Sequence, residues 1–242
     1  MRALVTGGGQ GIGAATVRRL AADGFDVAIH AHQHAKEAEE EATRVRAAGR
    51  ASFVATGDFA SAAGVRSVVD RVGQEWDSLD VLVNNAGAYD RATFLETTDD
   101  DLLAGFRVNL FAPFSLTREL LPLVRRSPSG RIIFVSSVLA FTGSANGAHY
   151  AAAKAGLLGL ARSLAKELAP GITVNVVAPG SIDTAILAGD SPERRAERGR
   201  TIPLGRIGTA AEVAEAIAFL ASPKASYLTG TTVHVNGGLR SD

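Results

Sequence analysis

The chain has 242 residues, 46% of them hydrophobic, and its 25 basic and 25 acidic residues leave no formal net charge. That length suffices for one large α/β domain with a well-buried core. A neutral balance provides no electrostatic footprint for a polyanion, so we expect no nucleic-acid partner. The absence of cysteine excludes disulfides, thiolate nucleophiles and cysteine-based zinc sites.

A short apolar run at the start of the chain leads directly into a glycine loop. No charged segment followed by a long apolar stretch precedes this loop, so we expect no signal peptide. Because no apolar run approaches the length of a membrane span, we expect no membrane association. Together with the lack of cysteine, these features fit a cytoplasmic enzyme.

Short apolar runs alternate with longer helical patterns. Runs that are apolar throughout are typical of strands that helices cover on both faces of a parallel sheet. We expect strands at residues 3–5, 27–29, 52–55, 81–83, 132–135, 173–177 and 232–235. We expect helices near residues 11–23, 36–48, 61–76, 99–125, 149–169 and 209–221. This order predicts an α/β fold: a single Rossmann-type doubly wound domain over residues 1–242, with a seven-stranded parallel sheet flanked by helices.

Residues 185–208 differ from the rest of the chain because they are polar, rich in arginine and interrupted by glycine and proline. One interpretation is a mobile, substrate-covering segment over the site. The other is a solvated surface helix with loops. Of the two, we expect the cover.

A glycine-rich turn, Thr6-Gly7-Gly8-Gly9-Gln10-Gly11-Ile12-Gly13, joins the first expected strand to the first expected helix. Glycines allow backbone N–H groups to approach a pyrophosphate, and the helix N-terminus adds a favourable partial charge. The spacing differs from G-x-G-x-x-G, and the absence of a following Gly-Lys-Ser/Thr excludes a P-loop. By itself, the turn also fits a tight strand-to-helix connection that binds nothing.

Tyr150 and Lys154 lie four residues apart on an alanine-rich helical segment, and therefore on one face. Tyrosine is a poor acid or base near neutrality because its usual pKa is about 10. An ammonium about 4 Å away is worth about 4 kcal/mol at an effective dielectric constant of ~20, which would lower that pKa by about three units. General acid–base catalysis would then be efficient. The alternative is an incidental surface pair.

Polar residues follow other expected strands. Ser137 comes after strand 132–135, at the carboxyl edge where open α/β sheets bind ligands, and its hydroxyl can hydrogen-bond a substrate carbonyl. The neighbouring Ser136 would point elsewhere because strand side chains alternate. The turn Asn84-Asn85-Ala86-Gly87 ends a second strand at this edge. Asn109 is a polar residue in an amphipathic helical segment, where a buried amide must find partners.

Together these residues resemble the classical short-chain dehydrogenase/reductase family over essentially the whole chain. The resemblance rests on the order and spacing of Thr6–Gly13, Asp58, Asn84–Gly87, Asn109, Ser137, Tyr150-x-x-x-Lys154, Pro179-Gly180-Ser181-Ile182-Asp183-Thr184 and Val235-Asn236-Gly237-Gly238. It implies an oxidoreductase in which a bound nicotinamide cofactor supplies the hydride and the protein supplies position and the proton.

The resemblance also implies roles for individual residues. Tyr150 would be the catalytic acid/base, and Lys154 would lower its pKa and hold the nicotinamide ribose. Ser137 would orient the reacting oxygen, and Asn109 would support a water-mediated proton relay. The implied cofactor-binding residues are Gly7, Gly9, Gln10, Gly11, Ile12, His32, Asp58, Phe59, Asn85, Ala86, Gly87, Tyr150, Lys154, Pro179, Gly180, Ile182 and Thr184. Of these, Asp58 would contact the adenine with Phe59 beside it, and Ile182 and Thr184 would hold the nicotinamide carboxamide.

The second strand indicates which nicotinamide is bound. NAD selectivity typically relies on an acidic residue after this strand, and the sequence here is His30-Ala31-His32-Gln33-His34. His32 or His34 could donate to a 2′-phosphate, so we expect NADP(H) rather than NAD(H). Gln10 points the other way, because NADP users of the family often have a basic residue there. No further ligand completes a metal shell at these histidines, so no metal is expected.

Within the family, the chain is most similar to 3-oxoacyl-[acyl-carrier-protein] reductases, which reduce a 3-ketoacyl thioester with NADPH. The similar stretches are Tyr150–Leu157, Gly171–Gly180 and Val235–Gly238. Carrier-dependent members often have basic residues before the fifth strand and after the catalytic helix. Here Pro128-Ser129 and Pro170-Gly171 occupy those positions, so the thioester can be free or carrier-bound.

Two alternatives belong to other functional classes. A dehydrogenase of a small alcohol or sugar would use the same residues in the opposite direction. A non-catalytic nucleotide-binding sensor is disfavoured because Tyr150, Lys154, Ser137 and Asn109 are all intact. The family resemblance further suggests a homotetramer, with residues 99–125 and the catalytic helix in one interface and residues 233–235 in another.

Overall fold

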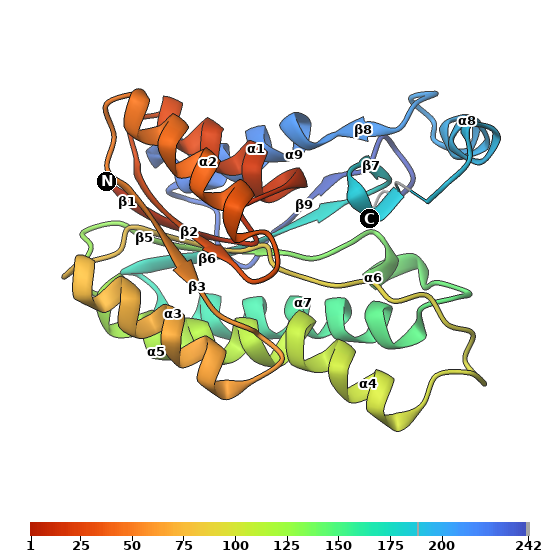
Figure 1. Cartoon of the computed structure of the whole chain (residues 1–242), viewed down its shortest axis with the longest axis horizontal. Coiled ribbons are helices and arrows are strands. Elements are labelled where there is room, and N and C mark those ends of the chain that lie inside the picture. Colours follow the sequence, from red (N-terminus) through yellow and green to blue (C-terminus); the bar gives the residue numbers. More distant parts are fainter. Residues whose placement is uncertain (188, 241–242) are drawn as a thin grey trace.

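A computed structural model describes residues 1–187 and 189–240. Residue 188 of the expected covering segment and residues 241–242 of the expected domain lie outside the described residues. Seven parallel strands form the central sheet in the order β3-β2-β1-β4-β5-β6-β9 (Figure 1). Their bounds are β1 Arg2–Thr6, β2 Asp26–Ala31, β3 Ser52–Thr56, β4 Val81–Asn84, β5 Gly130–Val135, β6 Ile172–Pro179 and β9 Thr232–Val235. The predicted fold class and all of the expected strands are confirmed.

Helices cover both faces of this sheet, as Figure 1 shows. One layer contains α1 (Gly11–Ala22), α2 (Ala35–Ala47) and α9 (Ala210–Ala221). The opposite layer contains α3 (Ala62–Glu75), α5 (Ala112–Val124) and α7 (Ala148–Leu168). Because both faces are covered, the strands need no polar face, which explains why their sequences are mostly apolar rather than alternating.

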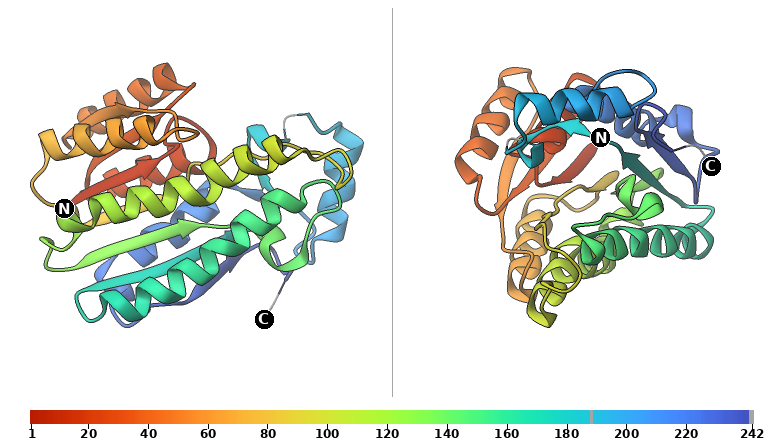
Figure 2. Two further views of the ribbon diagram at one scale, coloured as in Figure 1. Left: turned by 90° about the horizontal axis from the view of Figure 1, so that it is seen from below. Right: turned by 90° about the vertical axis from the view of Figure 1, so that its right-hand side faces the viewer.

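The helix expected over residues 99–125 is interrupted. α4 (Asp99–Phe106) passes into a π-helical segment, η1 (Arg107–Phe111), before α5 begins. The three run on as one long rod in Figure 2. A π-helical turn inserts an extra residue into the hydrogen-bonding pattern and is frequent at functional sites. Hydrophobic spacing cannot reveal it, since the apolar face continues across the insertion.

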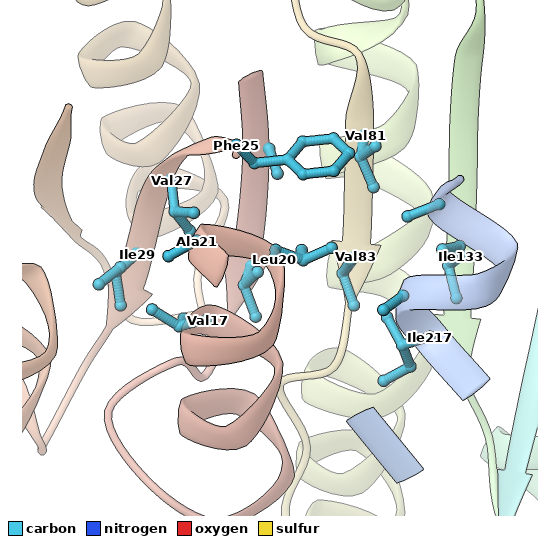
Figure 3. Close-up of a cluster of buried hydrophobic side chains, with 14 of the residues drawn as sticks. Val17, Leu20, Ala21, Phe25, Val27, Ile29, Val81, Val83, Ile133 and Ile217 are labelled. Carbon is cyan, nitrogen blue, oxygen red and sulfur yellow. The ribbon is translucent and has the colours of Figure 1, made fainter. Parts of the chain in front are cut away.

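Two hydrophobic clusters fill the space between the sheet and its helices. In the first, Leu20 of α1 lies beside Val83 of β4, and Val17 of α1 lies on the side of Ile29 of β2 (Figure 3). Ile217 of α9 lies beside Ile133 of β5. The second cluster lies on the other face, under α3, α5 and α7, with Phe134 and Leu157 fully buried. Such close packing makes the strand ends a rigid platform for the loops that follow them.

Smaller elements gather near the carboxyl ends of the strands. They are α6 (Leu139–Thr142), β7 (Ile182–Asp183) paired with β8 (Gly208–Thr209), η2 (Ala185–Leu187) and α8 (Pro192–Thr201). The short helix η3 (Pro223–Ala225) lies at the opposite end of the sheet, between α9 and the start of β9. α8 is mostly exposed. Ser191 caps its N-terminus, and the side chain of this serine accepts a hydrogen bond from Arg194 N. The described part of residues 185–208 therefore contains a surface helix, and its covering role stays a prediction. Among the described residues, none of the helices combines the length and hydrophobicity that crossing a membrane requires.

Two glycines of α3 predict opposite effects on stability. A Cβ at Gly73 would meet open space, whereas one at Gly64 would lie 2.0 Å from the Asp58 carbonyl oxygen. We expect Gly73→Ala to raise the free energy of unfolding by about 0.5–1 kcal/mol, because alanine loses less backbone entropy in a helix. Gly64→Ala should lower it by about 1–3 kcal/mol through overpacking. Urea unfolding of both variants tests this, and equal effects would contradict it.

Candidate active site

The carboxyl ends of β1, β4, β5 and β6 meet along one edge of the sheet. The strand order reverses between β1 and β4, which makes this edge a topological switch point. A cavity of about 770 Å³ opens here, and the loops after the first six strands line it. Its size is typical of a site for a small molecule or cofactor, for which pockets span about 300–1,000 Å³.

The glycine loop forms one wall of the cavity. Gly7 has a φ of +65°, which L side chains rarely adopt, and a Cβ at Gly13 would lie only 2.0 Å from the Gly7 carbonyl oxygen. α1 begins directly after the loop, and within the described residues no side chain caps its first turn and no acidic residue lies in it. The first N–H groups of α1 are therefore available to an anion.

A buried histidine supports this loop from below. His30 Nδ1 accepts a hydrogen bond from Gly7 N at 3.2 Å, and Nε2 lies 3.0 Å from the Gly57 carbonyl oxygen. Burial lowers the pKa of His30 to about 4. The ring is therefore neutral at pH 7, as its acceptor role at Nδ1 requires. The face of the His30 ring stacks on the Phe59 ring, with the ring centroids 3.8 Å apart.

The Asn84–Gly87 turn is tied to the glycine loop by Thr6. The Thr6 hydroxyl accepts hydrogen bonds from Asn85 N at 2.8 Å and Ala86 N at 2.9 Å. Asn85 Nδ2 donates to the Thr6 carbonyl oxygen at 2.8 Å. The ends of β1 and β4 therefore hold one another in register at the centre of the cavity wall.

β5 and α7 are joined by two buried hydrogen bonds. Lys154 Nζ donates to the Val135 carbonyl oxygen at 2.9 Å, and Ser136 Oγ donates to the Lys154 carbonyl oxygen at 2.8 Å. Ser136 thus anchors the helix, while the Ser137 hydroxyl accepts from Leu139 N at 3.1 Å. The two serine side chains therefore point to different partners, as the alternation of side chains along a strand predicts.

Tyr150 differs from expectation in its acidity. Burial raises the pKa of Tyr150 to about 12, while the Ser137 side chain hydrogen bond opposes this and Tyr89 reinforces it. Lys154 Nζ lies 5.8 Å from the centre of the Tyr150 ring. The pKa shift therefore has the opposite sign from the one that the Tyr-Lys spacing suggested, because loss of water outweighs the distant ammonium.

Lys154 is buried together with Tyr150, with only 3% of its surface exposed. Desolvation lowers the pKa of Lys154 to about 8. The side chain is consequently still an ammonium at pH 7 but loses its proton readily above that pH. A buried cation beside a buried phenol is costly for stability, which marks the pair as a candidate functional site.

Asn109 lies in the π-helical segment η1 and is completely buried. Its Nδ2 donates to the carbonyl oxygens of Gly105 and Ala88, both at 2.9 Å, and its Oδ1 accepts from Ala88 N at 3.2 Å. The amide thus satisfies the backbone at the helix distortion and also fixes the chain just after Gly87. Asn109 does not line the cavity but supports its wall from behind.

The end of β2 carries the residues expected near the adenosine. His32 is half-exposed, with Nδ1 3.7 Å from Asp58 Oδ1, and no carboxylate occupies residues 30–34. Phe59 is 6% exposed and lies on His30. With Asp58 they border the same end of the cavity.

The structure thus brings together residues from the whole length of the chain. Of the sequence-predicted site residues, all but Asn109 line this one cavity: Gly7, Gly9, Gln10, Gly11, Ile12, His32, Asp58, Phe59, Asn85, Ala86, Gly87, Ser137, Tyr150, Lys154, Pro179, Gly180, Ile182 and Thr184.

Sequence reasoning missed several residues of the cavity wall, chiefly Tyr89, Arg91, Arg194 and Arg198. The Tyr89 ring lies 4.5 Å from the Tyr150 ring, and its hydroxyl lies 2.8 Å from Ser144 Oγ. These residues belong to no motif. The only available signal was the arginine-rich composition of residues 185–208.

Comparisons with known proteins agree with this geometry. The sequence model of the family described as "Enoyl-(Acyl carrier protein) reductase" matches residues 7–240. The chain belongs to the short-chain dehydrogenase/reductase family. The resemblance seen in its motifs is thereby confirmed.

Among curated members of the family, the chain is 41% identical to the 3-oxoacyl-[acyl-carrier-protein] reductase FabG of Salmonella typhimurium, over 98% of this chain and 96% of that protein. It is 39% identical to FabG of Staphylococcus aureus, over 98% and 97% of the two chains.

Solved structures of the family are similar as well. A short chain dehydrogenase from Burkholderia cenocepacia in complex with NADP has a TM-score of 0.92 and 38% identity, over 99% of this chain and 98% of that one. A blue fluorescent protein from a metagenomic library in complex with NADPH has a TM-score of 0.92 and 40% identity, again over 99% and 98%.

The buried ammonium of this short-chain dehydrogenase/reductase predicts a conflict between stability and function. Below pH 8, Lys154 is charged in both the folded and unfolded states, and the folded state bears the desolvation cost. We expect Lys154→Met to raise the free energy of unfolding at pH 7 by about 1–2 kcal/mol. Removing the desolvation cost of the ammonium should stabilise the folded state by more than the lost hydrogen bond to Val135 destabilises it.

The gain should shrink as the pH rises from 8 towards the ordinary lysine pKa of 10.5, since the cost disappears once the amine is neutral in both states. Urea unfolding at pH 7 and at pH 10 measures the difference. Lys166→Met, at an exposed position of the same helix, is the matched control and should change little. A less stable Lys154→Met protein at pH 7 would refute this account.

Proposed function

We propose that this protein is an NADP(H)-dependent ketoreductase that reduces a 3-oxoacyl thioester, or a related ketone, to the hydroxy compound. The observation that carries the proposal is the convergence of Ser137, Tyr150 and Lys154 on the cavity that the glycine loop also lines. The similarity to FabG proteins, which are named as 3-oxoacyl-[acyl-carrier-protein] reductases, supports the substrate class.

The residues of the cavity fit a dinucleotide. The uncapped first turn of α1 and the glycine loop would hold the pyrophosphate, and Ile182 and Thr184 would hold the nicotinamide carboxamide. Asp58 and Phe59 would border the adenine. His32 would face the ribose end, where the lack of a carboxylate favours a 2′-phosphate and hence NADP(H). NADP and NADPH in the similar solved structures support this choice.

The reaction needs one hydride and one proton. When bound, NADPH would supply a hydride for the ketone carbon, and the Tyr150 hydroxyl would donate its proton to the carbonyl oxygen. A tyrosine whose pKa is about 12 stays protonated near neutrality, as a proton donor must. In ketone reduction Tyr150 begins in this protonated state, whereas alcohol oxidation would need it to begin as the base.

The neighbouring residues assist this proton transfer. The Ser137 hydroxyl would donate a hydrogen bond to the ketone oxygen and so orient it toward Tyr150. The Lys154 ammonium, still charged at pH 7, would stabilise the phenolate that remains after the transfer and hold the nicotinamide ribose. Asn109 would act as a positioning residue, since its amide fixes the backbone behind Gly87 and could support a water-mediated relay.

The substrate and the setting of the enzyme follow from the same similarity. We propose a small-molecule or thioester substrate that is free or bound to a carrier protein, as the names of the FabG relatives suggest. A role in fatty acid or polyketide biosynthesis in the cytoplasm fits this substrate and the lack of cysteine. Arg125 and Arg126 follow α5 and are exposed, so they could contact an acidic carrier.

Replacement of the proton donor tests the function. With NADPH and the N-acetylcysteamine thioester of 3-oxobutanoate, we expect Tyr150→Phe to reduce kcat by at least about 10³-fold, because general acid catalysis is removed. NADPH should still bind, as seen by fluorescence titration. Tyr227→Phe, at a fully exposed tyrosine, is the matched control. Turnover of Tyr150→Phe at the wild-type rate would refute the assignment, as would a preference for NADH over NADPH.

The oligomeric state is a second proposal. We propose a homotetramer in which α4, η1 and α5 form one interface, because Leu103, Phe111 and Phe114 are between 44% and 48% exposed there. Light scattering at micromolar concentration should give four times the chain mass of 25.0 kDa. Phe114→Glu should give smaller species, whereas Phe114→Leu should not. A wild-type monomer would contradict the proposal.

A further inference from the structure

Three arginines surround one buried carboxylate at the outer end of the cavity. Asp190 Oδ1 lies 3.3 Å from Arg91 Nη1 and 3.5 Å from Arg194 Nε, and its Oδ2 accepts a hydrogen bond from Arg198 Nε at 2.5 Å. The Asp190 side chain is 1% exposed. Arg91 comes from the loop before α4 and the other two from α8, segments that Figure 2 shows at the same end of the molecule. We call Arg91, Arg194 and Arg198 the arginine collar.

The collar carries more positive charge than Asp190 can neutralise. Each guanidinium has five N–H donors, and the contacts with Asp190 use only a few of them. The side chains of Arg91, Arg194 and Arg198 remain 33%, 56% and 29% exposed, and all three line the cavity. Donors and charge are therefore available on the side that faces the cavity.

Among residues 1–187 and 189–240, no acidic side chain besides Asp190 offsets this charge at this end of the cavity. Among the described residues, Asp58 is the only aspartate or glutamate on the cavity wall, and it follows β3 at the far edge of the sheet. In the segment around α8, Asp183 is paired with Arg195 outside the wall. The chain as a whole is neutral, so the positive end of the cavity is a local feature.

The collar lies close to the reacting group. The Arg91 guanidinium carbon is 5.6 Å from the centre of the Tyr89 ring, and that ring is 4.5 Å from the Tyr150 ring. Arg91 is therefore separated from the proton donor by a single aromatic ring. Val138, Leu139 and Leu187 also line the cavity and provide apolar surface for a short carbon chain.

We propose that the arginine collar binds a carboxylate at the end of the substrate's acyl chain, so that the preferred substrate is an acidic 3-oxoacyl compound. Guanidinium groups bind carboxylates through paired, charge-assisted hydrogen bonds. A phosphate on a carrier or coenzyme fits less well, because a long pantetheine arm separates it from the ketone, whereas Arg91 is near Tyr150. The proposal rests on the ketoreductase function proposed above.

A matched pair of substrates tests the proposal. The N-acetylcysteamine monothioester of 3-oxoadipic acid carries a terminal carboxylate, and its primary amide has nearly the same shape without the charge. We expect the wild-type enzyme with NADPH to show kcat/KM at least about tenfold higher for the acid, as charge-assisted hydrogen bonds imply. Equal values of kcat/KM would overturn the proposal.

Variants assign the preference to the collar. Arg91→Gln and Arg194→Gln should each lower the acid-to-amide ratio of kcat/KM by about tenfold, while turnover of the amide changes little. Arg91→Lys should restore part of the ratio because it keeps the charge. Arg195→Gln is the control, since Arg195 lies on the same helix but pairs with Asp183 away from the cavity. A ratio unchanged in both Gln variants would overturn the proposal.

Two further results have distinct meanings. If the Gln variants lose activity only toward 3-oxobutanoyl-coenzyme A, the collar binds the phosphate of the pantetheine arm and the carboxylate assignment is wrong. If wild-type protein binds NADPH but reduces neither the acid nor the amide, the ketoreductase function fails together with this inference. Reduction of the amide with no preference for the acid overturns the inference alone.

Discussion

The hydrogen bond from the Lys154 ammonium to the Val135 carbonyl oxygen is the interaction on which the site depends. It joins the end of β5 to the middle of α7, and Ser136 repeats the connection in the opposite direction. With this helix held against this strand, Tyr150 and Ser137 face the same cavity. The ammonium is almost fully buried, so its position is set by packing rather than by solvent.

This arrangement has a cost that the rest of the fold must offset. A buried cation beside a buried phenol loses hydration, and the lowered pKa of Lys154 and the raised pKa of Tyr150 are two signs of that loss. The hydrophobic clusters on both faces of the sheet supply stability that offsets this cost. The buried amide of Asn109, in the π-helical turn, has also lost its hydration, and its hydrogen bonds to the backbone of Gly105 and Ala88 replace the lost water.

Charge is distributed unevenly along the cavity, although the chain is neutral. At the β2 end, His32 is half-exposed beside Asp58, and the nearby His30 is kept neutral by burial. At the α8 end, one buried carboxylate faces several guanidinium groups. The reacting groups lie between these two ends. The two ends of the cavity therefore present different charges to a bound molecule. Such differences allow members of one fold family to bind different substrates.

The sequence by itself determined the sheet, the glycine loop and the location of Tyr150, because these depend on local patterns and on parallel strands that end at one edge. Only the tertiary structure decided the acidity of Tyr150, since burial comes from distant elements and outweighed the charge four residues away. The π-helical turn around Asn109 was also invisible, because the apolar pattern crosses it unchanged. Arg91 and Asp190 meet across 99 residues, and no local pattern encodes such a contact.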